Sequence, residues 1–158
     1  MDSSEIDNAL VAKLASDSEL LAMMPNGIYY GLAAEGSTRF VLVTLETATD
    51  IAQFGGRAIE ERYYLIEAVG LSSTNPAMQQ AAARIDQLLE DQPLTIDGYD
   101  WMTTYRIEPR RAPTEPDESN RSLRWFRRGG VYKVAATPAP VIVSAWMQDG
   151  WVQEGWTQ

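Results

Sequence analysis

Residues 40–70 read FVLVTLETATDIAQFGGRAIEERYYLIEAVG, and this stretch decides the fold. Its two ends, 40–47 and 62–69, are rich in Val, Thr, Tyr and Ile, which favour strands. The connection 47–58 is polar and contains Gly55 and Gly56, which is typical of a loop. The sequence therefore predicts a central antiparallel strand pair joined by a protruding polar loop.

Helices are predicted on both sides of this pair. Residues 4–14 and 19–24 form two short helices, followed by a strand at 28–30. A longer helix begins at Pro76, behind Asn75 as its N-cap, and runs to about residue 91. The residues expected to face the core repeat at helical spacing; they are Ile6, Leu10 and Leu14 in the first helix and Met78, Ala82, Ile85, Leu88 and Leu89 in the third.

Strands dominate the second half of the chain. Short runs predict strands at 94–96 and 99–107, separated by the turn Asp97-Gly98. Residues 109–122 are expected to form a long loop, and 123–136 the last strand, with a bulge at Gly129 and Gly130. Strands in runs with few helices predict an α+β domain over residues 1–137, with the helices on one face of an antiparallel sheet, followed by a C-terminal arm, 138–158.

Composition excludes several kinds of site. The 158 residues include no Cys and no His, which excludes disulfides, thiolate metal ligands and a Ser–His nucleophile. The acidic start of the chain and the lack of a long apolar run predict a soluble protein without a signal peptide or membrane span. No phosphate-binding glycine motif occurs.

The acidic residues do not form a recognisable catalytic arrangement. Glu60 and Glu61 are adjacent, so they would point to opposite faces of a strand. Together with Asp86, Glu90 and Asp91 they are expected to be solvent-exposed surface charges. We therefore expect no catalytic residue, no metal and no cofactor.

Charge is distributed unevenly along the chain. Residues 1–100 hold 16 acidic and 5 basic side chains, a net of −11, while residues 101–137 hold 4 acidic and 8 basic, a net of +4. An acidic body argues against a general DNA-binding module. It suits copies or partners that meet through opposite charges, although acidity that only maintains solubility is an equal alternative.

Seven arginines gather in the basic segment; they are Arg106, Arg110, Arg111, Arg121, Arg124, Arg127 and Arg128. With Trp101, Tyr105 and Trp125 nearby, this segment could bind nucleic acid. Because the rest of the chain is acidic, pairing with acidic neighbours is the favoured interpretation, and arginine suits ion pairs at interfaces.

The arm contains Trp146, Trp151 and Trp156 at intervals of five residues. This spacing matches neither a strand nor a helix, so one regular element would not place all three on one face. Since Trp is costly to leave in water, the arm is expected to pack on a neighbouring copy or partner; packing within its own domain is the alternative.

The order of these pieces resembles that of phage tail terminator or tail-completion proteins at the head-to-tail junction. The resemblance covers about residues 5–135. It is carried by ELLAMMPNGIYYGLAAEG, by FVLVTLETATD with IAQFGGRAIEERYYLIEAVG, by NPAMQQAAARIDQLLEDQPLTIDGY with WMTTYRIEPRR, and by RSLRWFRRGGVYKV. The Trp-rich arm departs from the family pattern.

The resemblance implies a structural virion protein without enzymatic activity. It implies a homo-hexameric ring in the neck that terminates the tail tube, joins it to the head connector or stopper protein, and assembles in the host cytoplasm. DNA would pass through the lumen without specific binding, and no membrane would be involved. The expected interface residues are Phe54, Gly55, Gly56, Arg57, Arg110, Arg111, Trp146, Trp151 and Trp156.

Two other interpretations remain open from the residues alone. One is a monomeric α+β binding module with a ligand under the 46–61 segment, and the other is a small hydrolase that uses carboxylates. The mass in solution separates them from a ring, which would show multiples of 17.6 kDa.

Overall fold

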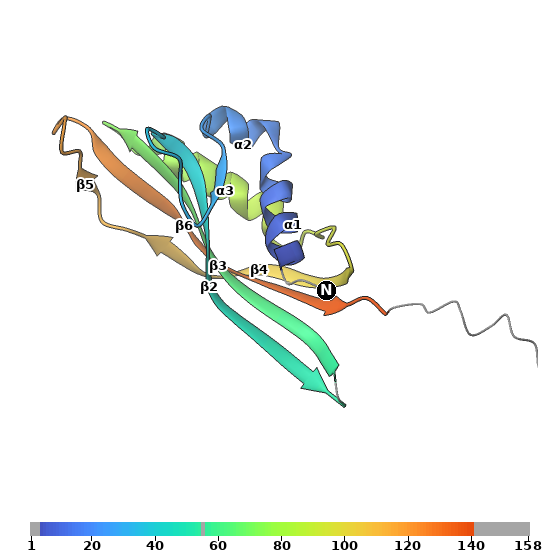
Figure 1. The fold of residues 1–158 in the computed structure, drawn as a ribbon. Coiled ribbons are helices and arrows are strands. Elements are labelled where there is room, and N and C mark those ends of the chain that lie inside the picture. The colour runs from blue at the N-terminus through green and yellow to red at the C-terminus, as the bar shows by residue number, and fades with distance from the viewer. Residues whose placement is uncertain (1–3, 55, 141–158) are drawn as a thin grey trace, which may run out of the picture.

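The computed structural model describes residues 4–54 and 56–140 (Figure 1). The elements are two helices, three strands, one helix and three strands. This matches the predicted order except that no strand forms at 94–96 and a two-residue strand at 115–116 lies within the predicted loop 109–122. Their bounds are α1 Ser4–Ala15, α2 Ser18–Met23, β1 Ile28–Tyr30, β2 Arg39–Gln53, β3 Gly56–Ser72, α3 Pro76–Leu89, β4 Tyr99–Arg111, β5 Glu115–Pro116 and β6 Arg124–Pro138.

The strands form one six-stranded sheet in the order β1-β2-β3-β6-β4, with β5 paired to β6. All pairs are antiparallel except β1 and β2, which run parallel with Ile28 opposite Val41. The fold is therefore α+β, as predicted.

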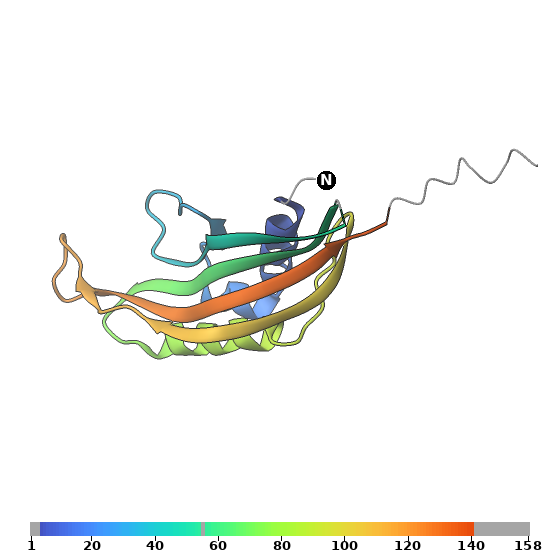
Figure 2. The same cartoon turned by 90° about the horizontal axis from the view of Figure 1, so that it is seen from below.

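The helices pack together on one side of this curved sheet (Figures 1 and 2). The predicted stripe Ile6, Leu10 and Leu14 of α1 is fully buried. In α3 the buried residues are Met78, Ala81, Ile85 and Leu89, so Ala81 rather than Ala82 faces the core. These side chains meet the inward-facing residues of the sheet, which are Val41, Val43, Tyr64, Ile66, Ala68, Tyr132, Val134 and Ala136.

The two helix starts differ in how they are capped. The Asp17 carboxylate accepts a 2.7 Å hydrogen bond from the backbone N–H of Leu20, which caps α2. Asn75 occupies the N-cap position of α3 as predicted, but its side chain makes no capping bond. Pro76 at the first helical position begins this helix instead, because its fixed φ suits a helix start.

The predicted loop 47–58 is wrong: it is a long β-hairpin. Strands β2 and β3 stay paired with Asp50 opposite Glu60 and Gln53 opposite Gly56, so only the tip turns. Polar residues suggested a loop, but the β-branched side chains along the segment favour an extended backbone that needs no buried face. The hairpin extends past the helices (Figure 1).

Three further predictions in the second half are wrong in detail. Residues 94–96 form no strand, although Leu94 and Ile96 are buried in the core. Strand β4 continues to Arg111, so the loop begins later than predicted. The predicted bulge at Gly129 and Gly130 is absent, because β6 pairs continuously with β3 through these residues. The register shifts are in β4 instead, between residues 101 and 103 and between 106 and 108.

Gly129 has a packing reason rather than a bulge. A Cβ atom at this position would lie 1.8 Å from the carbonyl oxygen of Ile66 on β3. Only glycine allows the strands to approach so closely here. A bulge is therefore unnecessary at this point of β6.

Strand β6 ends at Pro138, where the sequence predicts the domain boundary. The N–H of Ala139 still donates to the carbonyl of Gly98 at 2.9 Å. The arm residues Trp146, Trp151 and Trp156 lie outside the described residues. No helix in the described part of the chain is long and apolar enough to cross a membrane.

Candidate subunit interface

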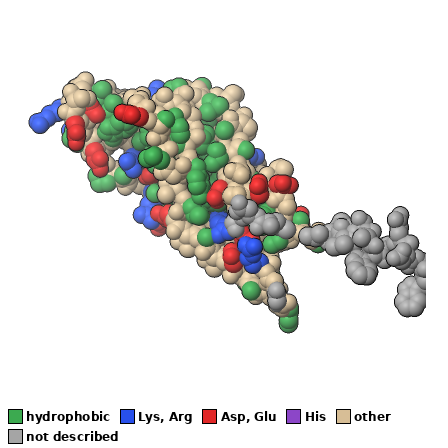
Figure 3. All heavy atoms as spheres, in the orientation of Figure 1, with side chains coloured by type: hydrophobic (Ala, Val, Ile, Leu, Met, Phe, Trp, Pro, Cys, Tyr) green, Lys and Arg blue, Asp and Glu red, His purple; other side chains and the backbone are tan. Residues whose placement is uncertain are grey.

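The end of the β2–β3 hairpin is an exposed apolar projection. Phe54 is fully exposed, and Ile51 near the tip is 38% exposed. Figure 3 shows hydrophobic atoms at the outermost end of the projection. Phe54 has a φ of 42°, in the left-handed region that a tight hairpin turn requires. An aromatic side chain held in water on a projecting turn is available for contact with another molecule.

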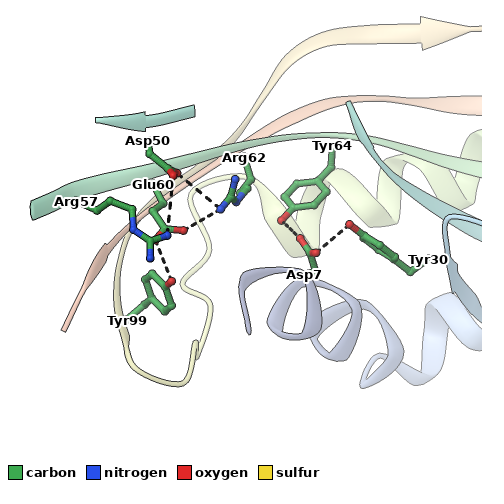
Figure 4. Close-up of polar contacts among 8 residues, drawn as sticks. All are labelled: Asp7, Tyr30, Asp50, Arg57, Glu60, Arg62, Tyr64 and Tyr99. Atoms are coloured by element: carbon green, nitrogen blue, oxygen red, sulfur yellow. Dashed lines mark hydrogen bonds and ion pairs between the residues drawn. The ribbon is translucent and has the colours of Figure 1, made fainter. Parts of the chain in front are cut away.

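A charged network braces the base of this hairpin (Figure 4). The carboxylate of Glu60 lies 3.0 Å from an Arg57 nitrogen and accepts a 2.9 Å hydrogen bond from Arg62. The hydroxyl of Tyr99 on β4 donates to the same carboxylate at 3.0 Å. Asp50 on β2 lies within 4 Å of both arginines, at 3.9 and 3.8 Å. The network therefore ties three strands together where the projection begins.

The predicted surface position of Glu60 is wrong, because its side chain is completely buried. Its neighbour Glu61 points to the opposite face, as predicted, and pairs with Lys133 at 2.5 Å. Removing one partner of a buried ion pair typically costs about 3–5 kcal/mol. Glu60 and Arg62 thus help to fix the hairpin's direction.

A second polar contact fastens α1 to the sheet beside this network. Asp7 accepts hydrogen bonds from the hydroxyls of Tyr30 and Tyr64 (Figure 4). Burial and the adjacent Asp7 carboxylate raise the pKa of Tyr30 to about 12. Both tyrosines therefore stay protonated as donors near neutral pH, and the contact is structural.

At the other end of the sheet, α3, β4 and β6 enclose a groove of about 390 Å³. We call it the arginine groove, since its charged lining consists of four arginines and a single acid; these are Arg106, Arg110, Arg111, Arg128 and Asp86. The single acid is already engaged, because Asp86 accepts hydrogen bonds from Arg106 and from the Tyr132 hydroxyl.

The arginines differ in how they are paired. Arg110 lies 2.7 Å from Glu108, and Arg127, outside the groove, lies 3.9 Å from Glu67. Arg111 and Arg128 stand directly opposite each other on β4 and β6. Neither forms an ion pair with any residue that the structure describes. The groove therefore keeps an uncompensated positive charge.

The expected interface residues fall at two separate places. Phe54, Gly56 and Arg57 lie at the hairpin, whereas Arg110 and Arg111 line the arginine groove at the far end of the sheet. Gly55 and the three arm tryptophans lie outside the described residues. Sequence reasoning did not single out Arg128 as a partner of Arg111, because their pairing depends on the register shift between residues 106 and 108 of β4.

The face of the sheet away from the helices carries a second apolar patch. Phe40, Val69, Val131 and Ala135 are each less than 9% exposed but do not belong to the main core. Glu67 lies on the same face and is 6% exposed. Burial raises the pKa of its carboxyl, opposed by the nearby charges of Arg127 and Arg110. The ionised carboxylate of Glu67 is therefore poorly stabilised where it lies on this face.

The sequence matches no known protein-family model and no curated protein. Solved structures do share the fold. One is a chain from a structure described as "Virion of native gene transfer agent (GTA) particle", with a TM-score of 0.63 at 15% sequence identity over 84% of this chain and 94% of that one. A second solved chain has a TM-score of 0.56 at 12% sequence identity, over 85% of this chain and 96% of that one. At these identities the likeness concerns the fold.

Proposed function

We propose that this protein is a structural component of a virion that forms a hexameric ring at the head-to-tail junction. In this role it terminates the tail tube and joins it to the head connector or stopper protein. The observation that carries the proposal is the fold shared with a chain of a gene transfer agent virion, which extends over 94% of that chain. The finer assignment, including the number six, rests on the resemblance to tail terminator proteins.

The layout of the two surfaces supports a head-to-tail ring. A ring of identical copies needs two different surfaces per copy, each meeting the other on its neighbour. The hairpin end of the sheet, where Tyr99 of the turn 97–100 bonds Glu60, and the arginine groove lie at opposite ends of one sheet. The braced base of the hairpin keeps the projection in a fixed direction, which a closed ring requires.

The ring would act without catalysis or a cofactor. Its partners would be other copies of itself, the tail tube protein and the connector, with assembly in the host cytoplasm and no membrane. DNA would pass through the lumen without specific binding, since a chain of net charge −9 repels phosphates.

The test combines mass in solution with location in particles. Native mass spectrometry of the purified protein is expected to show a species of six times 17.6 kDa at high concentration. Antibody-gold labelling of intact particles is expected to mark the top of the tail. If the protein remains a monomer at every concentration and the antibody labels no particle, the protein would instead be a monomeric binding module.

A further inference from the structure

We propose that the arginine groove of one copy binds the acidic turn 97–100 of a second copy of this chain. The inference deepens the proposed function and rests on it, because it names the contact that would join neighbours in a ring. Four arginines line the groove, but Arg106 pairs with Asp86 and Arg110 with Glu108. Arg111 and Arg128 remain, a charge of +2 in a protein whose net charge is −9. Such a contrast favours an anionic occupant.

The strongest support for an anionic ligand from outside the molecule is the pair Arg111 and Arg128. Like charges directly opposite each other on neighbouring strands are destabilising. Nothing in the described part of the chain offsets them with an ion pair, and the nearest groove acid, Asp86, is engaged by Arg106 and Tyr132. An anion from outside the molecule would turn this repulsion into attraction.

The chemistry of the groove favours carboxylates. Arginine presents a planar set of donors that fits a carboxylate with two parallel hydrogen bonds. The groove's volume of about 390 Å³ can admit a short turn carrying two such groups. A duplex nucleic acid is a poorer candidate, because the acidic remainder of the surface would repel it.

The turn 97–100 provides two carboxylates with the right exposure. Asp97 and Asp100 are exposed, and neither pairs with a described cation. Gly98 between them has a φ of 70°, which makes the turn tight enough to present both. The acids of the 115–119 turn border a different pocket, so they do not neutralise the groove.

The turn cannot reach the groove of its own molecule. Tyr99 pairs with Pro138 and Arg111 with Arg128, so ten residues of β6 separate the two sites. At about 3.3 Å per residue this separation is roughly 33 Å. A contact between the two sites therefore joins different copies, head to tail, as ring closure requires.

Reciprocal charge reversal tests the contact. The double variant Arg111→Glu with Arg128→Glu, and separately Asp97→Arg with Asp100→Arg, are each expected to weaken self-association by roughly tenfold or more. The quadruple variant is expected to restore most of the wild-type affinity, because the groove and the turn again carry charges of opposite sign. Sedimentation equilibrium at about 50 mM salt measures all four proteins, and high salt should weaken the wild-type contact.

A matched control distinguishes an effect of the groove from an effect of the change in net charge alone. Arg121→Glu with Arg124→Glu makes the same change in net charge at exposed positions outside the groove, and is expected to leave association unchanged. Circular dichroism melts confirm that each variant folds, and glutamine substitutions replace any that do not. Failure of the quadruple variant to recover, or full association of either double variant, overturns the proposed contact.

The outcome is distinguishable from failure of the proposed function. If gold labels the tail top and rings form in every variant, the ring stands and the groove contact is wrong. If the wild type stays at 17.6 kDa at all concentrations, the contact is wrong whatever the particle location. Binding of labelled duplex DNA that only the Arg111→Glu, Arg128→Glu variant loses, with association intact, would make the groove a nucleic-acid site and overturn the inference.

Discussion

Glu67 shows how a single buried charge can be tolerated without stabilising the fold. It is 6% exposed on the sheet face opposite the helices, and its nearest cation, Arg127, is 3.9 Å away. Because burial penalises the ionised carboxylate, the pKa is raised above the usual 4.5. The folded state therefore holds the proton more tightly than the unfolded state.

The substitution Glu67→Gln is expected to stabilise the protein at pH 7. Wild-type stability falls as pH rises from about 4.5 through the raised folded-state pKa, whereas the glutamine variant has no such loss. The gain in melting temperature, roughly 2–4 °C for each kcal/mol, should vanish below about pH 4. Glu118→Gln, at an exposed position, is the control and should change little. A lower melting temperature at pH 7 would mean that attraction to Arg127 outweighs burial.

At the scale of elements, the β2–β3 hairpin stands apart from the rest of the sheet. Residues 45–53 of β2 are exposed along their whole length, so the core does not hold this part in place. The buried Glu60 and its two arginines hold it instead, through the contacts at its base. The projection adds little to the protein's own core. This is consistent with the proposed role of the hairpin in contact with another copy.

Replacing residues 51–59 with Asn-Gly is expected to leave a folded monomer. Asp50 and Glu60 are opposite in the register, so a two-residue turn can join them. Glu60 keeps Arg62 and Tyr99 as partners, and the melting temperature should fall by only a few degrees. Ring formation, measured by native mass spectrometry, should be lost.

Phe54→Ser is the matched variant for this trimming, because it keeps the hairpin and removes only its apolar tip. If the aromatic side chain makes the contact, the two variants should lose assembly to a similar degree. Normal rings and normal tail lengths with the shortened hairpin would show that the projection is not needed for assembly.

At the scale of the whole molecule, the described core is complete before the arm begins. The last buried hydrophobic residue in the described range is Ala136, and β6 ends at Pro138. The bond from the N–H of Ala139 to Gly98 places the useful truncation point after Pro140. The three arm tryptophans are thus expected to serve a contact outside this core.

Truncation after Pro140 is expected to leave the monomer's melting temperature within about 2 °C of the wild type. Ring or neck stability should fall, because burying a Trp contributes several kcal/mol at about 25 cal/mol per Å². Thermal melts of the monomer and dissociation of assembled rings by dilution measure the two effects separately. A large drop in monomer stability would place Trp146, Trp151 and Trp156 in the protein's own core.

The sequence alone determined the fold class and the core face of α1. Ile6, Leu10 and Leu14 repeat at helical spacing, and local periodicity suffices to predict that they are buried. The α+β class followed from strands in runs with few helices. These features depend on residues close together in the chain, so the sequence carries them directly.

Only the tertiary structure decided which distant side chains meet. Glu60 looked like a surface charge, but Arg57, Arg62 and Tyr99 surround it once β3 and β4 take their places in the sheet. Arg111 faces Arg128 because the extra residue at 107 in β4 sets their register. Pairing across strands depends on register and bulges, and a shift of one residue sends each side chain to the opposite face. That is why the arginine groove and the braced hairpin emerge only in the folded sheet.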